Sequence, residues 1–261
     1  MTRLNKIVCV ILPIFICISG VLVTRAETPV KTVDFLSGTG VKVNGAGPLL
    51  VRADNKRNRV ILVNTYTSSL SVIDGKTKKV KNIPVRSRVP QYVKEEALAL
   101  DNRTGNIYVI GSKSLHVVFP GKGTSVTIAT GKQMEMAAVD EKTGNAFLAG
   151  RASKFLVMIN LKSKKLKKIP WRNWEEKPAN LNQTPPPPIC KVFCDNTLGR
   201  VIAVDGKTRQ LALYSTSGKQ LEKRQLKVPG GARWHTAGYN EKTHHLYTVI
   251  ETAKREVVAA V

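Results

Sequence analysis

Residues 54–85 read DNKRNRVILVNTYTSSLSVIDGKTKKVKNIPV, and this segment carries the clearest signal of the fold. It opens on a turn residue, Asp54, and a nearly continuous apolar strand begins about five residues later. An alternating strand follows, then an Asp-Gly turn of the kind that closes β-hairpins, then a lysine-rich strand that contains Pro84. The stretch and the residues just before it predict four antiparallel strands, at Leu49–Ala53, Asn58–Thr65, Ser69–Ile73 and Lys79–Val85.

The same pattern occurs five times along the chain. The acidic or amide residues that begin the copies are 47, 39, 55 and 45 residues apart, and they are Asp54, Asp101, Asp140, Asp195 and Asn240. A period near forty residues is typical of a β-propeller blade, which cannot bury its own faces and therefore packs against its neighbours. The sequence predicts an all-β fold: a β-propeller of four-stranded antiparallel blades, with about five blades present. The strands Val60–Val63, Ile107–Ile110 and Val201–Val204 are expected to be buried.

The first copy resembles a known repeat. Val63-Asn64-Thr65-Tyr66, followed by Ser69 to Asp74, is similar to the YVTN-type repeat of exported bacterial propellers. The segment Gly230 to His235 is similar to a blade start in the wider group of amine-dehydrogenase-like propellers. This resemblance implies seven blades, whereas the fifth copy has only three predicted strands. Either the chain is a fragment of a seven-bladed propeller, or Thr32–Phe35 or Gly40–Val43 supplies the missing strand and closes the ring.

The first 26 residues read as an export signal. Arg3 and Lys6 precede an apolar stretch, Ile7–Val23, and Thr24-Arg25-Ala26 places small residues where a signal peptidase reads. We expect cleavage after Ala26 and a periplasmic or secreted protein that consists of a propeller domain, residues 27–261. The alternative is an uncleaved membrane anchor. Cleavage leaves Cys190 and Cys194, whose spacing along a straight strand is too long for an easy disulfide.

A proline-rich insertion, residues 172–188, lengthens the spacing between the third and fourth copies. Trp171 and Trp174 lie at its start, and Pro185 to Pro188 favour an extended stretch without internal hydrogen bonds. Because tryptophan is frequent in binding hot spots, these two side chains are candidate contacts to a partner. The alternative is a loop that folds back so that the tryptophans cover the edge of a blade.

Charge is the second strong feature. Of 42 basic residues, Arg3, Lys6 and Arg25 lie in the expected signal, which leaves 39 against 18 acidic residues, a net charge of +21. The lysines gather in the predicted outer hairpins, and those of the third copy include Lys164, Lys165, Lys167 and Lys168. Lysine on an exposed edge strand prevents edge-to-edge pairing, which explains the positions but not the excess. The excess predicts an acidic protein, an anionic polymer or a membrane surface as partner, and not a nucleic acid.

No pattern for catalysis, for a metal or for a cofactor stands out, and Cys-x-x-Cys-His is absent. Trp234 and His235, at the start of a predicted innermost strand, are further candidates for partner binding, although a hydrogen-bonded structural histidine is an alternative. We therefore expect a non-catalytic binding or scaffold protein without a cofactor. One alternative is a propeller subunit of a periplasmic redox complex, in the manner of amine dehydrogenase heavy chains or the hydrazine synthase propeller subunit. Another is a hydrolase with its site in the channel, such as a lactonase.

Overall fold

The structure is a computed structural model that describes residues 47–85, 97–150, 153–171, 190–226, 233–251 and 256–260. All of them belong to one compact unit, Asp34–Val261. In this part of the chain β-strands dominate, and η1 (Asn55–Arg57) is a short 3-10 turn. None of the described helical residues forms a helix long and apolar enough to cross a membrane.

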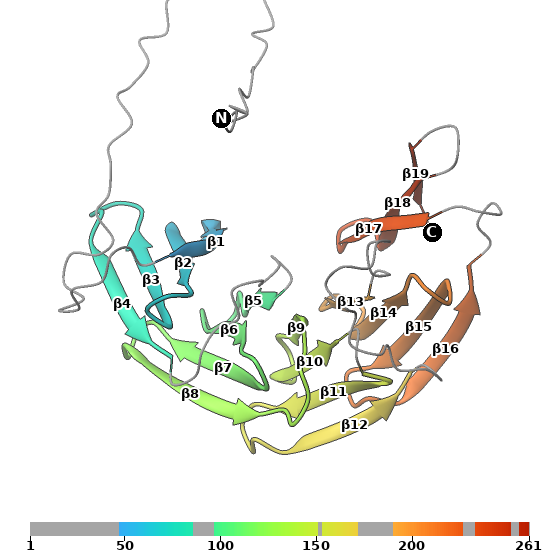
Figure 1. The fold of residues 1–261 in the computed structure, drawn as a ribbon, viewed down its shortest axis with the longest axis horizontal. Helices are drawn as coiled ribbons and strands as arrows, with labels where there is room; N and C mark the ends of the chain where they lie inside the picture. Colours follow the sequence, from blue (N-terminus) through green and yellow to red (C-terminus); the bar gives the residue numbers. More distant parts are fainter. Residues whose placement is uncertain are drawn as a thin grey trace, which may run out of the picture. The chain divides into compact units, whose positions relative to one another are not determined.

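The strands form four sheets of four strands and one sheet of three, and every neighbouring pair is antiparallel and consecutive in the sequence (Figure 1). The first sheet holds β1 (Pro48–Asp54), β2 (Arg59–Asn64), β3 (Ser69–Asp74) and β4 (Val80–Pro84). The second holds β5 (Leu98–Leu100), β6 (Ile107–Ile110), β7 (Ser114–Phe119) and β8 (Thr124–Ala129). The third holds β9 (Met136–Asp140), β10 (Asn145–Ala149), β11 (Phe155–Asn160) and β12 (Leu166–Pro170). The fourth holds β13 (Cys190–Asp195), β14 (Arg200–Asp205), β15 (Gln210–Ser215) and β16 (Gln220–Gln225), and the fifth holds β17 (Arg233–Asn240), β18 (His245–Glu251) and β19 (Glu256–Ala260).

The residue that begins each copy closes the turn between the first two strands of its sheet. The Asp101 carboxylate accepts hydrogen bonds from the backbone amides of Arg103 and Thr104, at 2.8 and 2.9 Å. Four positions after each of these residues the backbone is left-handed, at Asn58, Gly105, Gly144, Gly199 and His244. Asp and Asn side chains stabilise such turns, and Gly and Asn tolerate the left-handed backbone. The repeat seen in the sequence is therefore a repeated turn.

Shared cores join consecutive sheets. Leu148 and Val157 of the third sheet lie in a buried cluster with residues of the second, and Phe147 and Leu156 lie in a cluster with residues of the fourth. Two further clusters join the first sheet to the second and the fourth to the fifth. Among the described residues no buried cluster joins the fifth sheet to the first. The prediction of an all-β propeller with about five four-stranded blades is confirmed, and the described sheets do not close a ring.

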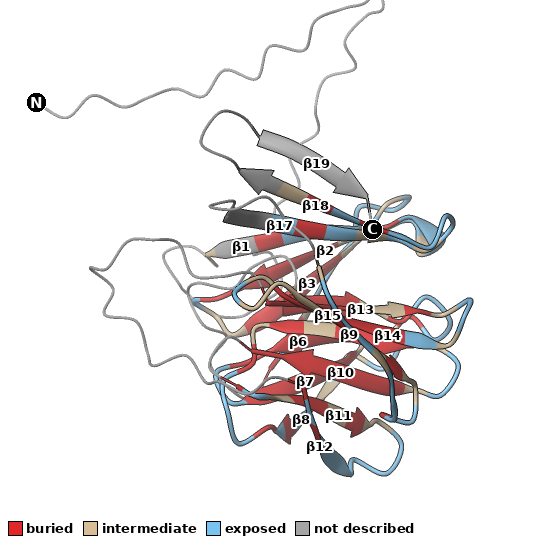
Figure 2. Cartoon of the chain, turned by 90° about the vertical axis from the view of Figure 1, so that its right-hand side faces the viewer, coloured by how far each residue is buried: buried red, intermediate tan, exposed pale blue. Residues whose placement is uncertain are grey.

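Burial decreases from the middle strands to the outer ones (Figure 2). Ile107–Ile110 and Val201–Val204 are buried throughout, as predicted, whereas Val60 is only half-buried. In β16 five of six residues are exposed, which is the surface that the lysines occupy. The expected signal at residues 1–26, the insertion at residues 172–188 and the closing segments Thr32–Phe35 and Gly40–Val43 lie outside the described residues.

Candidate functional site

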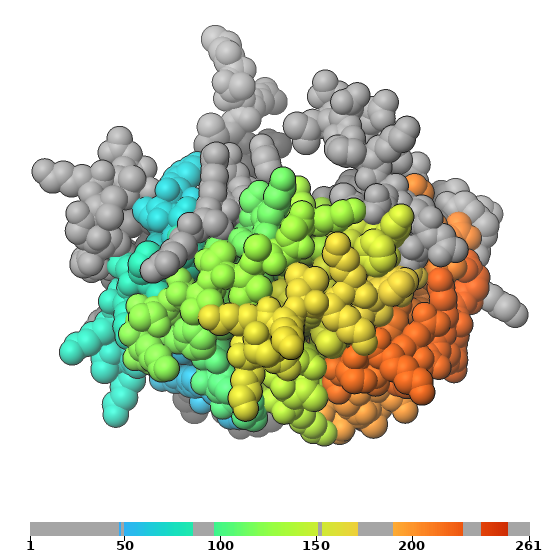
Figure 3. Space-filling model, turned by 90° about the horizontal axis from the view of Figure 1, so that it is seen from below, coloured from blue at the N-terminus to red at the C-terminus, as the bar shows by residue number. Residues whose placement is uncertain are grey.

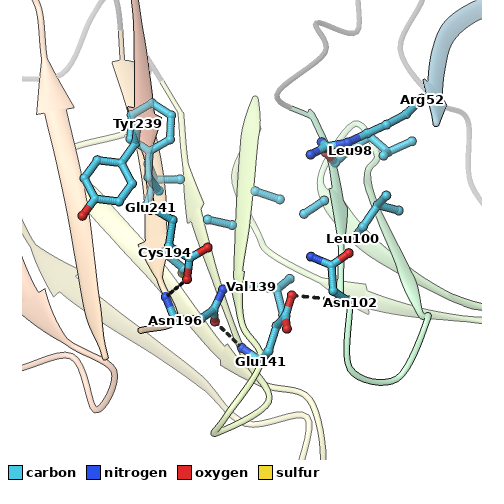
Figure 4. A pocket seen from close by; sticks show the side chains of 15 residues that line it. Arg52, Leu98, Leu100, Asn102, Val139, Glu141, Cys194, Asn196, Tyr239 and Glu241 are labelled. Atoms are coloured by element: carbon cyan, nitrogen blue, oxygen red, sulfur yellow. Dashed lines mark hydrogen bonds between the residues drawn. The ribbon is translucent and has the colours of Figure 1, made fainter. Parts of the chain in front are cut away.

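A cavity of about 260 Å³ lies among the innermost strands (Figure 4). All five sheets contribute to its lining, which shows that it lies at the centre of the repeat. Arg52 lies across the cavity from Tyr239, and its guanidinium donates to the carbonyl of Leu98 at 2.7 Å. The lining residues are Arg52, Leu98–Leu100, Asn102, Ala137–Val139, Glu141, Val192–Cys194, Asn196, Tyr239 and Glu241.

One end of the cavity is lined by a series of hydrogen-bonded turns. The backbone amide of Asn102 donates to Glu141 Oε1 at 2.9 Å, and that of Glu141 donates to Asn196 Oδ1 at 2.7 Å. The backbone amide of Asn196 in turn donates to Glu241 Oε1 at 2.7 Å. Each of these residues directly follows the turn residue that begins its copy. The side chains of Glu141, Asn196 and Glu241 thus tie the turns of the second to the fifth sheet to one another.

Asp195, between the lining residues Cys194 and Asn196, is a carboxylate with three hydrogen-bond partners. Its Oδ2 accepts from the Tyr239 hydroxyl at 2.5 Å and lies 2.8 Å from His244 Nδ1, and its Oδ1 accepts from the Leu198 amide at 2.9 Å. Burial disfavours the charged form, but the hydrogen bonds from Tyr239, Leu198 and His244 outweigh it and lower the pKa of Asp195. Burial, followed by the hydrogen bond to Asp195, raises the pKa of Tyr239. The group is an ionised aspartate held by a neutral phenol, which is a stabilising arrangement between two sheets.

The two cysteines behave as sequence spacing predicts. Both are free thiols in the uninterrupted strand β13, with Cys190 fully buried and Cys194 half-buried against the cavity. Burial, followed by the charges of Asp140 and Glu241, raises the pKa of Cys194 well above its ordinary value. Because the thiolate is the reactive form, the Cys194 thiol is a poor nucleophile at neutral pH.

The described residues offer little for catalysis by histidine or for metal binding. His116 is buried in β7 between the hydroxyls of Ser114 and Thr127, at 3.2 and 3.0 Å, and burial lowers its pKa to about 4. No group of three or more His, Cys, Asp or Glu side chains in the described part of the chain could hold a metal ion.

The predicted rim lysines lie on the outer hairpin of the third sheet. Lys164, Lys165, Lys167 and Lys168 are all exposed. Lys167 has a second role, because its ammonium donates to the carbonyl of Ser217 in the fourth sheet at 3.2 Å. Lys81 occupies the same place in the first sheet and donates to the carbonyl of Pro120 at 2.8 Å. One lysine in each of these two outer strands therefore also ties its sheet to the next.

Trp171 lies in the core and not on the surface. Only 4% of its surface is exposed, it belongs to the cluster between the third and fourth sheets, and its indole N–H donates to the carbonyl of Ser153 at 3.3 Å. Val85, which also follows an Ile-Pro pair at the end of an outer strand, is 5% exposed. Trp171 thus has little surface to offer a partner.

The remaining predicted contacts are not described in full. Trp174 lies outside the described residues, and Trp234 and His235 belong to β17 but their side chains lie outside the described part. The structure brings the four lysines together and separates Trp171 from them. Sequence reasoning missed Glu141, Asn196 and Glu241. The sequence pattern that could have identified them is a polar residue directly after the turn residue that begins each copy.

Comparison with known proteins supports the fold. No family model matches the sequence, and no curated protein sequence matches it. Among solved structures, hydrazine synthase of Kuenenia stuttgartiensis matches with a TM-score of 0.60 and 16% identity, over 85% of this chain and 60% of that one. Dihydro-heme d1 dehydrogenase NirN matches with a TM-score of 0.58 and 14% identity, over 83% of this chain and 45% of that one. Virginiamycin B lyase from Staphylococcus aureus matches with a TM-score of 0.55 and 9% identity, over 85% and 71%.

These similarities define the class of protein. The chain is a β-propeller protein, and it spans 60% of the hydrazine synthase chain and 45% of the NirN chain that it matches. At such low identities the likeness concerns the fold, on which many unrelated functions occur, so function has to be argued from the surfaces of this chain.

Proposed function

We propose that this chain is an exported, non-catalytic β-propeller that binds an acidic partner through its lysine-rich outer strands. The observation that carries the proposal is the exposure of basic residues on neighbouring outer strands. Residues 162–168 and 219–225 contain eight basic residues and one acidic residue, Glu222, which is paired with Arg224. Edge protection explains why lysines occur on these strands, but not their excess. The proposal includes removal of residues 1–26 and a relationship to the YVTN-type propellers.

The charge acts at long range and the contact surface acts at short range. At physiological salt, attraction between exposed charges is screened over about 8 Å, so a partner held by this surface should associate more slowly as salt rises. Changes of rim charge should alter mainly the association rate. Since Trp171 is buried, Trp174 is the remaining candidate of this pair for a short-range anchor.

The test is capture of partners from an extract of the source organism, at low and at moderate salt. The wild-type chain is compared with a rim variant, Lys164/Lys165/Lys167/Lys168→Glu, and with Trp174→Ala. We expect an acidic macromolecule to be retained by the wild-type chain at low salt and to be lost from the rim variant. Equal retention by all three proteins would show that the rim is not the binding surface.

A second candidate function is a subunit of an exported redox complex. The observation in its favour is that one of the matched structures, NirN, is a dehydrogenase by its title. In this case the rim would bind another subunit of the complex, and the captured acidic partner would be a redox protein. A partner without a redox centre would count against this candidate.

A further inference from the structure

The outer strands of the third and fourth sheets form one continuous surface. The Lys167 ammonium reaches the carbonyl of Ser217, and the Tyr214 hydroxyl donates to the carbonyl of Pro170 at 3.2 Å. These two bonds join β12 to the fourth sheet, and Figure 3 shows the yellow surface of the third sheet bordering the orange surface of the fourth. We call residues 162–168 and 219–225 the basic rim surface.

Two leucines lie within this surface. Leu166 is 37% exposed and Leu221 is 52% exposed, and both are among the six large hydrophobic residues that are exposed in the described part of the chain. Leu166 stands between Lys165 and Lys167, and Leu221 stands between Lys219 and Lys223. Isolated exposed leucines need no explanation. Here two of them lie on the outer strands of neighbouring sheets, and each has lysines close to it along its strand.

The composition of the surface separates two kinds of partner. Protein interfaces are enriched in aromatic residues and arginine and depleted in lysine. The basic rim surface contains seven lysines, one arginine and no aromatic residue. An anionic bilayer is different, because lysines near it add their attraction roughly independently and the long side chains reach headgroups without a fixed geometry. Exposed leucines between the lysines can enter the boundary between headgroups and acyl chains, as the apolar face of an interfacial segment does.

We infer that the basic rim surface binds anionic phospholipid membranes, with its lysines on the headgroups and with Leu166 and Leu221 inserted between them. The inference rests on the proposed function, because it names the acidic partner as a lipid surface. Adsorption of this kind places the outer strands of the third and fourth sheets against the bilayer. The cavity is lined from the opposite, innermost edges of the sheets, so it stays open to the aqueous side.

The test measures binding of the full chain to vesicles of phosphatidylcholine mixed with phosphatidylglycerol and to vesicles of phosphatidylcholine alone. Neutral vesicles report any binding through the apolar stretch Ile7–Val23, which is independent of rim charge. For the vesicle experiment the rim variant is a different one, Lys165/Lys168/Lys223→Glu, which leaves the bond of Lys167 to Ser217 intact. The matched control is Lys56/Lys113/Lys242→Glu, which changes the net charge equally at exposed turn residues.

We expect the wild-type chain to prefer the anionic vesicles, and the rim variant to bind them about 100-fold more weakly, while the control stays within several-fold of wild type. Leu221→Ala keeps every charge and should weaken binding several-fold, with an unchanged thermal unfolding transition as the check on folding. No preference for anionic vesicles, or equal losses in the rim variant and the control, would overturn the inference. If vesicles fail to bind while an acidic protein is captured through the rim, the proposed function stands and the lipid assignment falls. Unchanged binding by Leu221→Ala would remove the leucine insertion.

Discussion

Strands β10 and β12 belong to the same sheet, and they follow opposite rules. Every residue of β10 is buried, whereas in β12 only Ile169 is. Side chains of β10 alternate between the core shared with the second sheet and the core shared with the fourth, as Leu148 and Phe147 do. A strand with a sheet packed on each face must be apolar throughout. An outer strand keeps one core residue and is free to carry charge, so the chemistry that distinguishes this propeller lies on strands such as β12.

The largest expected effect is the loss of stability when a side chain of β10 is truncated. Phe147 is fully buried between the third and fourth sheets, so Phe147→Ala should lower the free energy of unfolding by about 3–5 kcal/mol. Leu166→Ala in β12, at a residue that is partly exposed, should cost less than about 1 kcal/mol. Both values come from urea unfolding followed by circular dichroism. Similar losses in the two variants would mean that β12 is packed as tightly as β10.

Strand positions could be predicted because the repeat encodes them twice, once in the turn and once in the apolar run. The predicted strand Ser69–Ile73 is observed as Ser69–Asp74, and the predicted Lys79–Val85 is observed as Val80–Pro84. Exposure of Lys164 to Lys168 was also predictable, because charged residues on an outer hairpin have no neighbouring sheet to bury them.

The interior of the site could not be predicted in the same way. Glu141 and Asn196 are bonded to each other across 55 residues, and nothing local in the sequence indicates which turn faces which. The sequence left open whether Trp171, at the start of a polar, proline-rich segment, contacts a partner or covers the edge of a blade. The structure continues the register of β12 by one residue and so directs its side chain into the core, as it does for Val85 in the first sheet. Val85 and Trp171 each follow an Ile-Pro pair, and comparing these two places in the sequence would have predicted that Trp171 is buried.

The second largest expected effect is a loss of stability at acid pH, and it is due to a buried histidine. His116 is fully buried, and its pKa of about 4 lies below the unfolded value of 6.5. As the pH falls below 6.5, His116 becomes protonated in the unfolded chain, whereas in the folded chain it stays neutral until about pH 4. The contribution of His116 to the free energy of unfolding is therefore fully present above the unfolded pKa. It decreases by about 3 kcal/mol as the pH falls from the unfolded to the folded pKa.

His116→Gln keeps hydrogen-bonding groups for Ser114 and Thr127 but does not titrate, so it isolates this contribution. Unfolding free energies of the wild-type chain and of this variant should be compared near neutral pH and near the folded pKa. The loss on acidification should be smaller in the variant by about 3 kcal/mol. An identical loss in both proteins would mean that His116 takes up its proton equally readily in the folded and the unfolded chain, and that its surroundings are wetter than the structure shows.

The smallest effects should come from neighbouring lysines of β12. Lys168 is exposed, and its side chain makes no hydrogen bond or ion pair to the described residues, so Lys168→Ala should change the free energy of unfolding by less than about 0.5 kcal/mol. Lys167 donates to the carbonyl of Ser217, so Lys167→Ala should cost more, about 0.5–1 kcal/mol, because a bond between sheets is lost. The two substitutions remove the same charge from the same strand, and thermal unfolding of both variants against the wild type therefore separates the bond from the charge. Equal effects would show that Lys167 contributes only charge. If both substitutions stabilise the chain, repulsion among the rim lysines outweighs the bond. This result is expected of a surface selected for an anionic partner and not for the stability of the propeller alone.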